Sequence, residues 1–200
     1  MTALQGHDRY QQFNRRRYHR KGLSYLLYRS MGDRVILPRL EQIREQEVLE
    51  VGLGAGYYTE LLLQNGNQIT GIDANPHMGE HLPVTIHEAP ADDFSRHIGE
   101  DSVDVVASFW MTEYLSPPEV TAFVREAIVV LRPGGLFLST FVADRGWGWF
   151  YRTASRVRGI TKYGYHDSEM AMLLEGRAHE IVQIPGRLGL PYAFMVMIRI

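Results

Sequence analysis

From residue 47 onward, short runs rich in β-branched residues alternate with segments whose apolar residues recur at helical spacing. This alternation is typical of parallel strands joined by helical crossovers. We predict strands at residues 47–53, 68–73, 84–88, 103–109, 136–141, 179–184 and 192–199. The last two are joined by too few residues for a helical crossover, so this pair is predicted to be antiparallel. The expected α/β fold is a seven-stranded, mostly parallel sheet with helices on both faces and an antiparallel last strand.

Local signals place helices between these strands. Residues 57–63 follow a glycine-rich turn and show helical spacing of apolar side chains. Ser116 and Glu119 form a capping-box pattern at the start of another helix, and a further helix is predicted at 168–175. Residues 1–46 are rich in arginine and aromatic side chains, and we predict one or two helices there that pack against the domain.

The composition excludes several classes of protein. Apolar residues make up 45% of the chain and charged residues 22%, as in ordinary globular domains. No apolar run reaches the length of a membrane span, and we find no pattern of a signal peptide at the N-terminus. A chain of 200 residues is expected to form a single domain. The absence of cysteine excludes disulfides and a cysteine nucleophile, and it fits the cytoplasmic location that we expect.

A glycine-rich turn carries the strongest functional signal. Gly52, Gly54 and Gly56 lie between a predicted strand and a helix, where glycine lets a ligand approach the backbone closely. Asp73 ends the next strand, and an acidic residue there can accept hydrogen bonds from ribose hydroxyls. Both features lie at the carboxyl ends of neighbouring strands, where doubly wound sheets bind ligands.

The turn differs from the dinucleotide-binding fingerprint. A G-x-G-x-x-G pattern would need glycine at position 57 or 59, and the chain has Tyr57 and Thr59 there. Glu50 lies two residues before the first glycine, where a carboxylate suits an amino group or cation better than a phosphate. A nicotinamide-dependent dehydrogenase is therefore disfavoured.

Five ordered segments together resemble the class I S-adenosylmethionine-dependent methyltransferases. They are Val48–Gly56, Gly71–Asn75, His87–Phe94, Asp104–Phe109 and Leu131–Gly135. The resemblance covers residues 47–142 and extends to the last two strands. It implies S-adenosyl-L-methionine as cofactor, with S-adenosyl-L-homocysteine as product. It implies the following cofactor-binding residues: Glu50, Gly52, Gly54, Gly56, Asp73, Ala74, Asn75, Asp92, Phe109 and Trp110.

The resemblance also implies a role for each of these positions. The glycines would line the methionine and ribose, Glu50 would lie near the amino end, and Asp73 would hold the ribose hydroxyls. Ala74 and Asn75 would flank the adenine. The family often has an aspartate at the position of Pro90, so Asp92, or else Asp93, would replace it at the adenine edge. Alternatively, these two carboxylates cap a surface turn, and Trp110 is a core residue.

The resemblance divides the chain into an N-terminal helical cap (1–46), a cofactor-binding core (47–142), a substrate lid (143–167) and a C-terminal part (168–200). The lid is aromatic and basic, and Trp147, Phe150, Tyr151 and Ala154 are predicted to share one helical face. Such a lid suits an acceptor with apolar and anionic parts, or peripheral contact with a membrane surface. Alternatively, its aromatic residues cover the sheet and its arginines are solvated.

Three residues are candidates for a general base: Glu113, Tyr114 and His166. A base helps only when the acceptor is a hydroxyl or an acidic carbon, because a sulfonium already carries an activated methyl group. The alternative for each is a packing or surface role. No Asn/Asp-Pro-Pro-aromatic motif follows the fourth strand, which argues against the adenine and glutamine methyltransferases that use it.

Charge is distributed unevenly along the chain. Residues 1–40 have a net charge of +7 and the remainder −9. The basic segment includes Arg15, Arg16 and Arg17 and could contact nucleic acid, but the acidic remainder disfavours this. His77 and His81 could share a helix face and bind a metal, but no third ligand is evident and we predict no metal site.

The sequence therefore predicts methyl transfer to a small-molecule or lipid-like acceptor with apolar parts, with or without an anionic group. Two alternatives stay open: a non-catalytic regulatory protein that binds S-adenosylmethionine, and an RNA or protein methyltransferase. The acceptor atom and the oligomeric state are not specified by the sequence.

Overall fold

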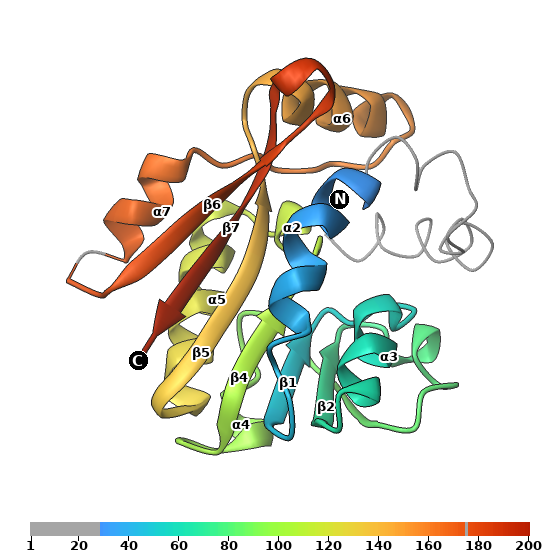
Figure 1. Ribbon diagram of the computed structural model, residues 1–200. Helices are drawn as coiled ribbons and strands as arrows, with labels where there is room; N and C mark the ends of the chain where they lie inside the picture. The colour runs from blue at the N-terminus through green and yellow to red at the C-terminus, as the bar shows by residue number, and fades with distance from the viewer. Residues whose placement is uncertain (1–28, 175) are drawn as a thin grey trace.

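The computed structural model describes residues 29–174 and 176–200, and these form a seven-stranded sheet in the order β3-β2-β1-β4-β5-β7-β6 (Figure 1). The first five strands are parallel, and β7 is antiparallel to both β5 and β6. The predicted fold class is confirmed. The strands are β1 (Glu47–Val51), β2 (Gln68–Asp73), β3 (Thr85–Glu88), β4 (Val103–Ser108), β5 (Leu131–Val142), β6 (His179–Pro185) and β7 (Pro191–Arg199).

Helices cover both faces of the sheet. One apolar cluster contains buried residues of α2 and α3, and the other contains those of α5 and α7. The helices are α2 (Ser30–Leu40), α3 (Tyr57–Gln64), α4 (Ser95–Ile98), α5 (Pro117–Val130), α6 (Gly146–Val157) and α7 (Asp167–Leu173), with short 3-10 helices η2 (Pro76–Met78), η3 (Thr112–Tyr114) and η4 (Arg187–Gly189). None of these described helices is long and apolar enough to cross a membrane.

Capping explains where α5 begins. The Ser116 backbone N–H and side-chain hydroxyl both donate to Glu119 Oε2 at 2.6 Å, and the helix starts at the following proline. This is the predicted capping box. The strand after it differs from the prediction, because β5 begins at Leu131 rather than at residue 136. Leu131 pairs with Val103 before a shift in register, so the turn-like segment between Arg132 and Gly135 lies inside the strand.

The segment predicted as a lid forms α6, which follows the carboxyl end of β5 and lies at the top of Figure 1. Its first turn packs against β7, because a Cβ added at Gly148 would lie 2.6 Å from the carbonyl oxygen of Tyr192. Trp147 and Tyr151 are half-buried, but Phe150 is 52% exposed. The ring centroids of Trp147 and Phe150 lie 5.9 Å apart, so these two residues share a face as predicted, and Phe150 lies at its exposed edge.

The N-terminal segment is described only from Arg29. Met31 and Val35 of α2 pack against the cluster that α2 shares with α3, in agreement with the predicted packing of an N-terminal helix against the domain. Residues 1–28 of the basic segment, which include Arg15 to Arg17, lie outside the described residues.

Candidate functional site

The glycine turn follows the carboxyl end of β1. Gly52, Gly54 and Gly56 have φ values of 74°, 54° and 75°, in the left-handed region that favours glycine. A Cβ at Gly52 would lie 2.3 Å from Met111 Cγ, so this position has no room for a side chain. No described atom lies within 4 Å of a Cβ added at Gly54. The backbone of Gly54 is therefore open to a ligand.

Asp73 ties this turn to the end of β2. Its Oδ2 accepts a hydrogen bond from Gly54 N at 2.8 Å, and its Oδ1 accepts one from Asn75 N at 2.9 Å. Ala74 between them is exposed, whereas Asn75 is buried. No described group accepts a hydrogen bond from Asn75 Nδ2. This edge of the sheet therefore combines a held carboxylate, an open backbone turn and a buried amide donor.

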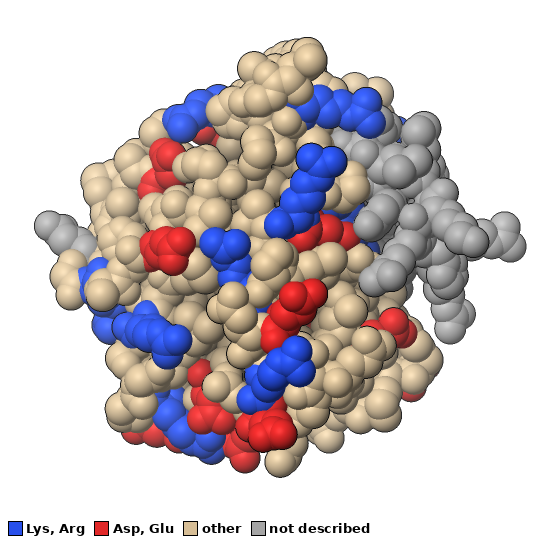
Figure 2. Space-filling view, in the orientation of Figure 1, with Lys and Arg blue, Asp and Glu red and all other residues tan. Residues whose placement is uncertain are grey.

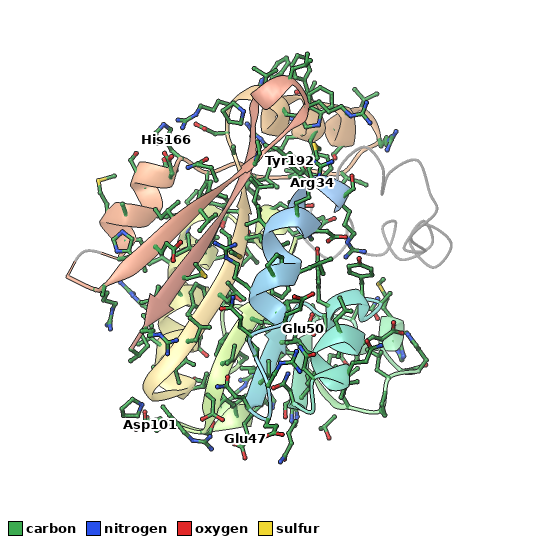
Figure 3. All side chains as sticks on the ribbon, in the orientation of Figure 1. Arg34, Glu47, Glu50, Asp101, His166 and Tyr192 are labelled. Carbon is green, nitrogen blue, oxygen red and sulfur yellow. The ribbon has the colours of Figure 1, made fainter. Side chains whose placement is uncertain are left out.

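Glu50 lies beneath the turn, between β1 and α3 (Figure 3). It is 2% exposed, and Thr59 Oγ1 donates a hydrogen bond to its Oε2 at 2.6 Å. Burial raises the pKa of Glu50 to about 7, and the hydrogen bond from Thr59 opposes this rise. The nearby Asp73 carboxylate raises the pKa further, and Arg29 lowers it. The charge of this carboxylate therefore changes near neutral pH.

Side chains near the start of α2 contact the first turn of α3. Asp33 is 4% exposed and accepts hydrogen bonds from the hydroxyls of Tyr57 and Tyr58, each at 2.8 Å. Trp110 Nε1 donates to the Tyr58 hydroxyl at 2.9 Å, and the Arg29 guanidinium lies 4.4 Å from the ring centroid of Tyr57. Sequence reasoning missed Arg29 and Asp33. The adjacent tyrosines after the glycine turn were the available signal.

The two aromatic residues after β4 pack differently from each other. Phe109 is buried, with its ring centroid 4.6 Å from that of Tyr58. Trp110 is only half-buried, has a φ of 60°, and stacks on Tyr192 at 5.4 Å. Its backbone N–H donates to Thr140 Oγ1 at 2.8 Å. These contacts fix both side chains, and their predicted place beside the cofactor stays a prediction.

The acidic residues predicted at the adenine edge lie in the turn after β3. Asp92 is half-buried, whereas Asp93 is exposed and forms an ion pair with Arg96 at 3.2 Å. Glu126 of α5 supports this turn from below, because its Oε2 accepts hydrogen bonds from the backbone N–H groups of Phe94 and Ser95. Between the two candidates, Asp92 is the one without a surface ion pair among the described residues.

Glu113 forms a buried cluster with two residues of the predicted lid. It is 1% exposed; its Oε1 accepts a hydrogen bond from the Tyr151 hydroxyl at 2.8 Å and from the Lys162 ammonium. Lys162 also contacts the Tyr151 hydroxyl, and its Nζ lies 4.8 Å from the ring centroid of Tyr114. Glu113 Oε2 is buried and has no hydrogen-bond partner among the described residues. Lys162 thus contacts both candidates, Glu113 and Tyr114.

The third candidate base lies apart from this cluster. His166 caps the start of α7, where its ring accepts a hydrogen bond from Ser168 N at 3.3 Å. Its other ring nitrogen contacts Arg145, and Figure 3 shows it at the rim of the molecule. The histidines considered for a metal do not share a helix face, because η2 ends at Met78, before His81. His77 contacts Glu80, and no group of three or more potential ligands occurs within the described ranges.

Comparison with known proteins identifies the fold and its glycine turn. A sequence profile described as a methyltransferase domain matches residues 49–139. Within residues 49–139, the chain carries a methyltransferase domain. This match confirms the predicted resemblance, and S-adenosylmethionine is the cofactor of this family. The match begins within β1 and ends within β5, and it includes the glycine turn, Asp73 and Glu113.

Curated relatives of this methyltransferase domain are similar over part of their length. The chain is 29% identical over 157 residues to the ubiquinone biosynthesis O-methyltransferase of Paramagnetospirillum magneticum, covering 70% of this chain and 61% of that protein. It is 34% identical over 100 residues to a probable S-adenosylmethionine-dependent methyltransferase of Mycolicibacterium smegmatis, covering 46% and 37%. The chain thus spans less than two thirds of the length of these relatives.

Solved structures share the fold of the methyltransferase domain. A SAM-dependent methyltransferase from Archaeoglobus fulgidus aligns with a TM-score of 0.71 and 15% identity, over 90% of this chain and 96% of that one. The 1,6-didemethyltoxoflavin-N1-methyltransferase of Burkholderia thailandensis, solved with S-adenosylhomocysteine, aligns with a TM-score of 0.67 and 16% identity, over 100% and 90%.

We predict that Glu50 makes stability depend on pH. Its folded-state pKa of about 7 lies above the ordinary value of 4.5, so its contribution to stability is present below about pH 4.5 and is lost as pH rises through 7. The wild-type protein should lose about 3 kcal/mol relative to Glu50→Gln between pH 4.5 and 8. Urea denaturation of both proteins at a series of pH values measures this.

Thr59→Val provides a directional check on this assignment. Removing the Thr59 hydroxyl takes away the hydrogen bond that lowers the pKa of Glu50, so the pH-dependent loss should grow. Parallel stability curves for the wild-type protein and Glu50→Gln would show that Glu50 titrates in the same range in both states, which contradicts the assignment.

Proposed function

We propose that this protein transfers a methyl group from S-adenosylmethionine to a small-molecule or lipid-like acceptor with apolar and anionic parts. The observation that carries the proposal is the Asp73 carboxylate, which is held by Gly54 N and Asn75 N at the carboxyl edge of the sheet. A ribose has two adjacent hydroxyls from which such a carboxylate can accept hydrogen bonds. The open backbone at Gly54 and the buried amide of Asn75 fit the remainder of a nucleoside.

The residues of the turn would each bind a different part of the cofactor. Asp73 would hold the ribose, and Asn75 and Asp92 would lie toward the adenine. Glu50 would face the amino end, where its carboxylate form attracts a positive charge. The sulfonium of S-adenosylmethionine supplies the activated methyl group, so the protein has to align the acceptor and exclude water. The half-buried Trp110 would provide an apolar wall there.

Two observations support the acceptor class. The relatives named above include one named for ubiquinone biosynthesis and a structural neighbour named for a toxoflavin precursor, both of them small molecules. The segment from residue 145 to 166 contains five basic residues, several aromatic residues and no acidic residue. An acceptor with an apolar body and an anionic group matches this composition.

We predict that Asp73→Asn weakens binding of S-adenosylhomocysteine about tenfold or more. The substitution replaces one acceptor oxygen by a donor, which opposes both Gly54 N and a ribose hydroxyl, and hydrogen bonds to a charged group are worth about 1.5–3 kcal/mol. Isothermal titration calorimetry measures the affinity. Asp101→Asn is the matched control, because Asp101 lies at the opposite end of the sheet (Figure 3).

The outcomes separate the competing functions. Equal affinity of Asp73→Asn and the wild-type protein would disprove the ribose assignment, and no binding at all would exclude every function that uses this cofactor. Transfer of the tritiated methyl group of S-adenosylmethionine to phenols with an alkyl tail and a carboxylate would support the proposed acceptor class. Binding without transfer to phenols, RNA or protein indicates the regulatory alternative, and labelling of RNA or protein alone indicates the macromolecular one.

We further propose Glu113 as the proton acceptor for a hydroxyl substrate, with Tyr114 beside it. Its Oε1 is engaged by Lys162 and Tyr151, which fixes the carboxylate, and its Oε2 has no partner among the described residues. Glu113 also lies just beyond the carboxyl end of β4, the strand next to β1. His166 is less suited to this role, because its ring is engaged in capping α7.

Glu113→Gln should lower the turnover of a phenolic acceptor about 100-fold to 10,000-fold without changing the affinity for S-adenosylhomocysteine. The same substitution leaves Lys162 buried without a counter-charge, which costs about 3–5 kcal/mol of stability. The double variant Glu113→Gln, Lys162→Met removes that buried charge and should recover stability but not turnover. Recovery of turnover in the double variant would show that Glu113 acts only through packing.

The molecule has an exposed apolar surface that we propose contacts a membrane peripherally. Its residues, here called the tip surface, are Trp149, Phe150, Val157, Leu188 and Leu190, exposed by 50%, 52%, 85%, 95% and 40%. The helix α6 and the loop that contains η4 adjoin, because a Cβ added at Gly186 would lie 2.6 Å from Trp147 Cβ. Figure 2 shows this end as a tan protrusion with basic side chains on both sides.

The backbone of Leu188 adds to this argument. Leu188 has a φ of 59°, a conformation that costs a leucine free energy, and its side chain is almost fully exposed. Neither packing nor backbone preference within the described structure accounts for an apolar residue at this position. Insertion into the boundary between lipid headgroups and acyl chains would bury it, and the neighbouring arginines would attract anionic lipids.

The double variant Leu188→Ser, Phe150→Ser should weaken binding to vesicles of phosphatidylcholine with phosphatidylglycerol about tenfold or more, because each side chain loses its apolar burial. Vesicle co-sedimentation measures this. Met172→Ser is the matched control, since Met172 is 67% exposed on α7, outside the tip surface. Equal losses in both variants, or no vesicle binding by the wild-type protein, would contradict the proposal.

A further inference from the structure

A pocket on α6 lies outside the residues assigned to the cofactor. It is lined by Trp149, Arg152, Thr153, Arg156 and Lys162. Arg152, Thr153 and Arg156 follow Trp149 by three, four and seven positions, so these four residues share one face of the helix. Lys162 comes from the segment that returns after the helix. Three of the five lining residues are basic and none is acidic.

Arg152 is held in place before any ligand arrives. Its Nη2 donates a hydrogen bond to the Asp144 carbonyl oxygen at 2.8 Å, and a Cβ added at Gly164 would lie 2.5 Å from its Nε. Burial lowers the pKa of Arg152, and repulsion from Arg156 lowers it further, against the opposing effect of Asp144. Its Nε is buried and has no hydrogen-bond partner among the described residues. The guanidinium is thus fixed, partly desolvated and incompletely satisfied.

The pocket has two other basic side chains, of which Lys162 is neutralised by an ion pair and Arg156 is not. Lys162 is paired with Glu113, so it forms a wall of the pocket and adds little net charge. Arg156 is exposed, and within the described ranges its side chain makes no hydrogen bond or ion pair. Two like charges therefore remain close together, and an anion between them would relieve their repulsion.

We propose that this pocket binds a phosphate group. The Arg152 and Arg156 guanidiniums would donate to its oxygens, the Thr153 hydroxyl would supply a neutral donor, and the Trp149 ring would form one wall. A phosphate carries up to two negative charges, which suits a site with two guanidiniums. The group could come from a soluble phosphate compound or from a lipid headgroup. This inference goes beyond methyl transfer, because it needs neither the cofactor nor an acceptor.

Titration of the full-length protein with inorganic phosphate, in a buffer without other oxyanions, tests the pocket. Calorimetry should show binding by the wild-type protein, with the affinity about tenfold lower in Arg156→Gln and in Arg152→Gln. Arg158→Gln is the matched control, because it removes the same charge two residues along, outside the pocket lining. Since Arg156 is exposed, its variant should fold normally, which thermal unfolding checks.

A second arm distinguishes the sources of the phosphate. Vesicles of phosphatidylcholine with phosphatidic acid should bind the wild-type protein, and Arg156→Gln should lose more affinity than Arg158→Gln if the pocket takes a headgroup. Binding of inorganic phosphate with equal vesicle binding by both variants assigns the pocket to a soluble phosphate. Absence of phosphate binding together with equal vesicle binding, or equal losses in Arg156→Gln and Arg158→Gln in both arms, overturns the proposal.

These results can be separated from the fate of the proposed methyl transfer. Binding of S-adenosylhomocysteine is measured on the same variants and depends on Asp73, far from α6 in the sequence. A protein that binds the cofactor but no phosphate would disprove only the pocket, and the reverse result would disprove only the methyltransferase proposal.

Discussion

The candidate site depends on one carboxylate held by two backbone amides. Asp73 accepts hydrogen bonds from Gly54 N and Asn75 N, and so joins the turn after β1 to the loop after β2. The positive φ values of the three glycines allow this, because they aim the turn's N–H groups across the strand ends. Parallel pairing of β1 with β2 then sets the distance between the two loops. The binding edge is thus a consequence of strand order and glycine geometry together.

The surroundings of this carboxylate set the charge of the site. Glu50 lies on the same edge, and burial together with Asp73 raises its pKa to about 7. Arg29 opposes that rise from the start of α2, so the helix that covers the site also regulates its electrostatics. Asp33 keeps this helix in position by accepting hydrogen bonds from Tyr57 and Tyr58. A cationic ligand would replace part of the role of Arg29 toward Glu50.

Local patterns predicted the sheet, the glycine turn and Asp73, because each depends on residues close together in the sequence. The contact between Glu113 and Lys162 joins residues 49 positions apart, and no spacing rule relates them. The same holds for Asp33, whose tyrosine partners lie 24 and 25 positions away. The exposure of Phe150 could not be predicted, because helical periodicity gives the faces of a helix but not the face that β7 contacts.

Lys162 links the two ends of the functional region. Its ammonium is bound to Glu113 after β4, and its side chain also lines the basic pocket on α6. A buried ion pair of this kind contributes little net stability, since desolvation offsets the attraction, but it fixes the position of both partners. The pair therefore holds the return segment of α6 against the carboxyl edge of β4. An anion in the pocket would lie beside Lys162, so the pocket on α6 and the carboxyl edge of β4 would be linked through this ion pair.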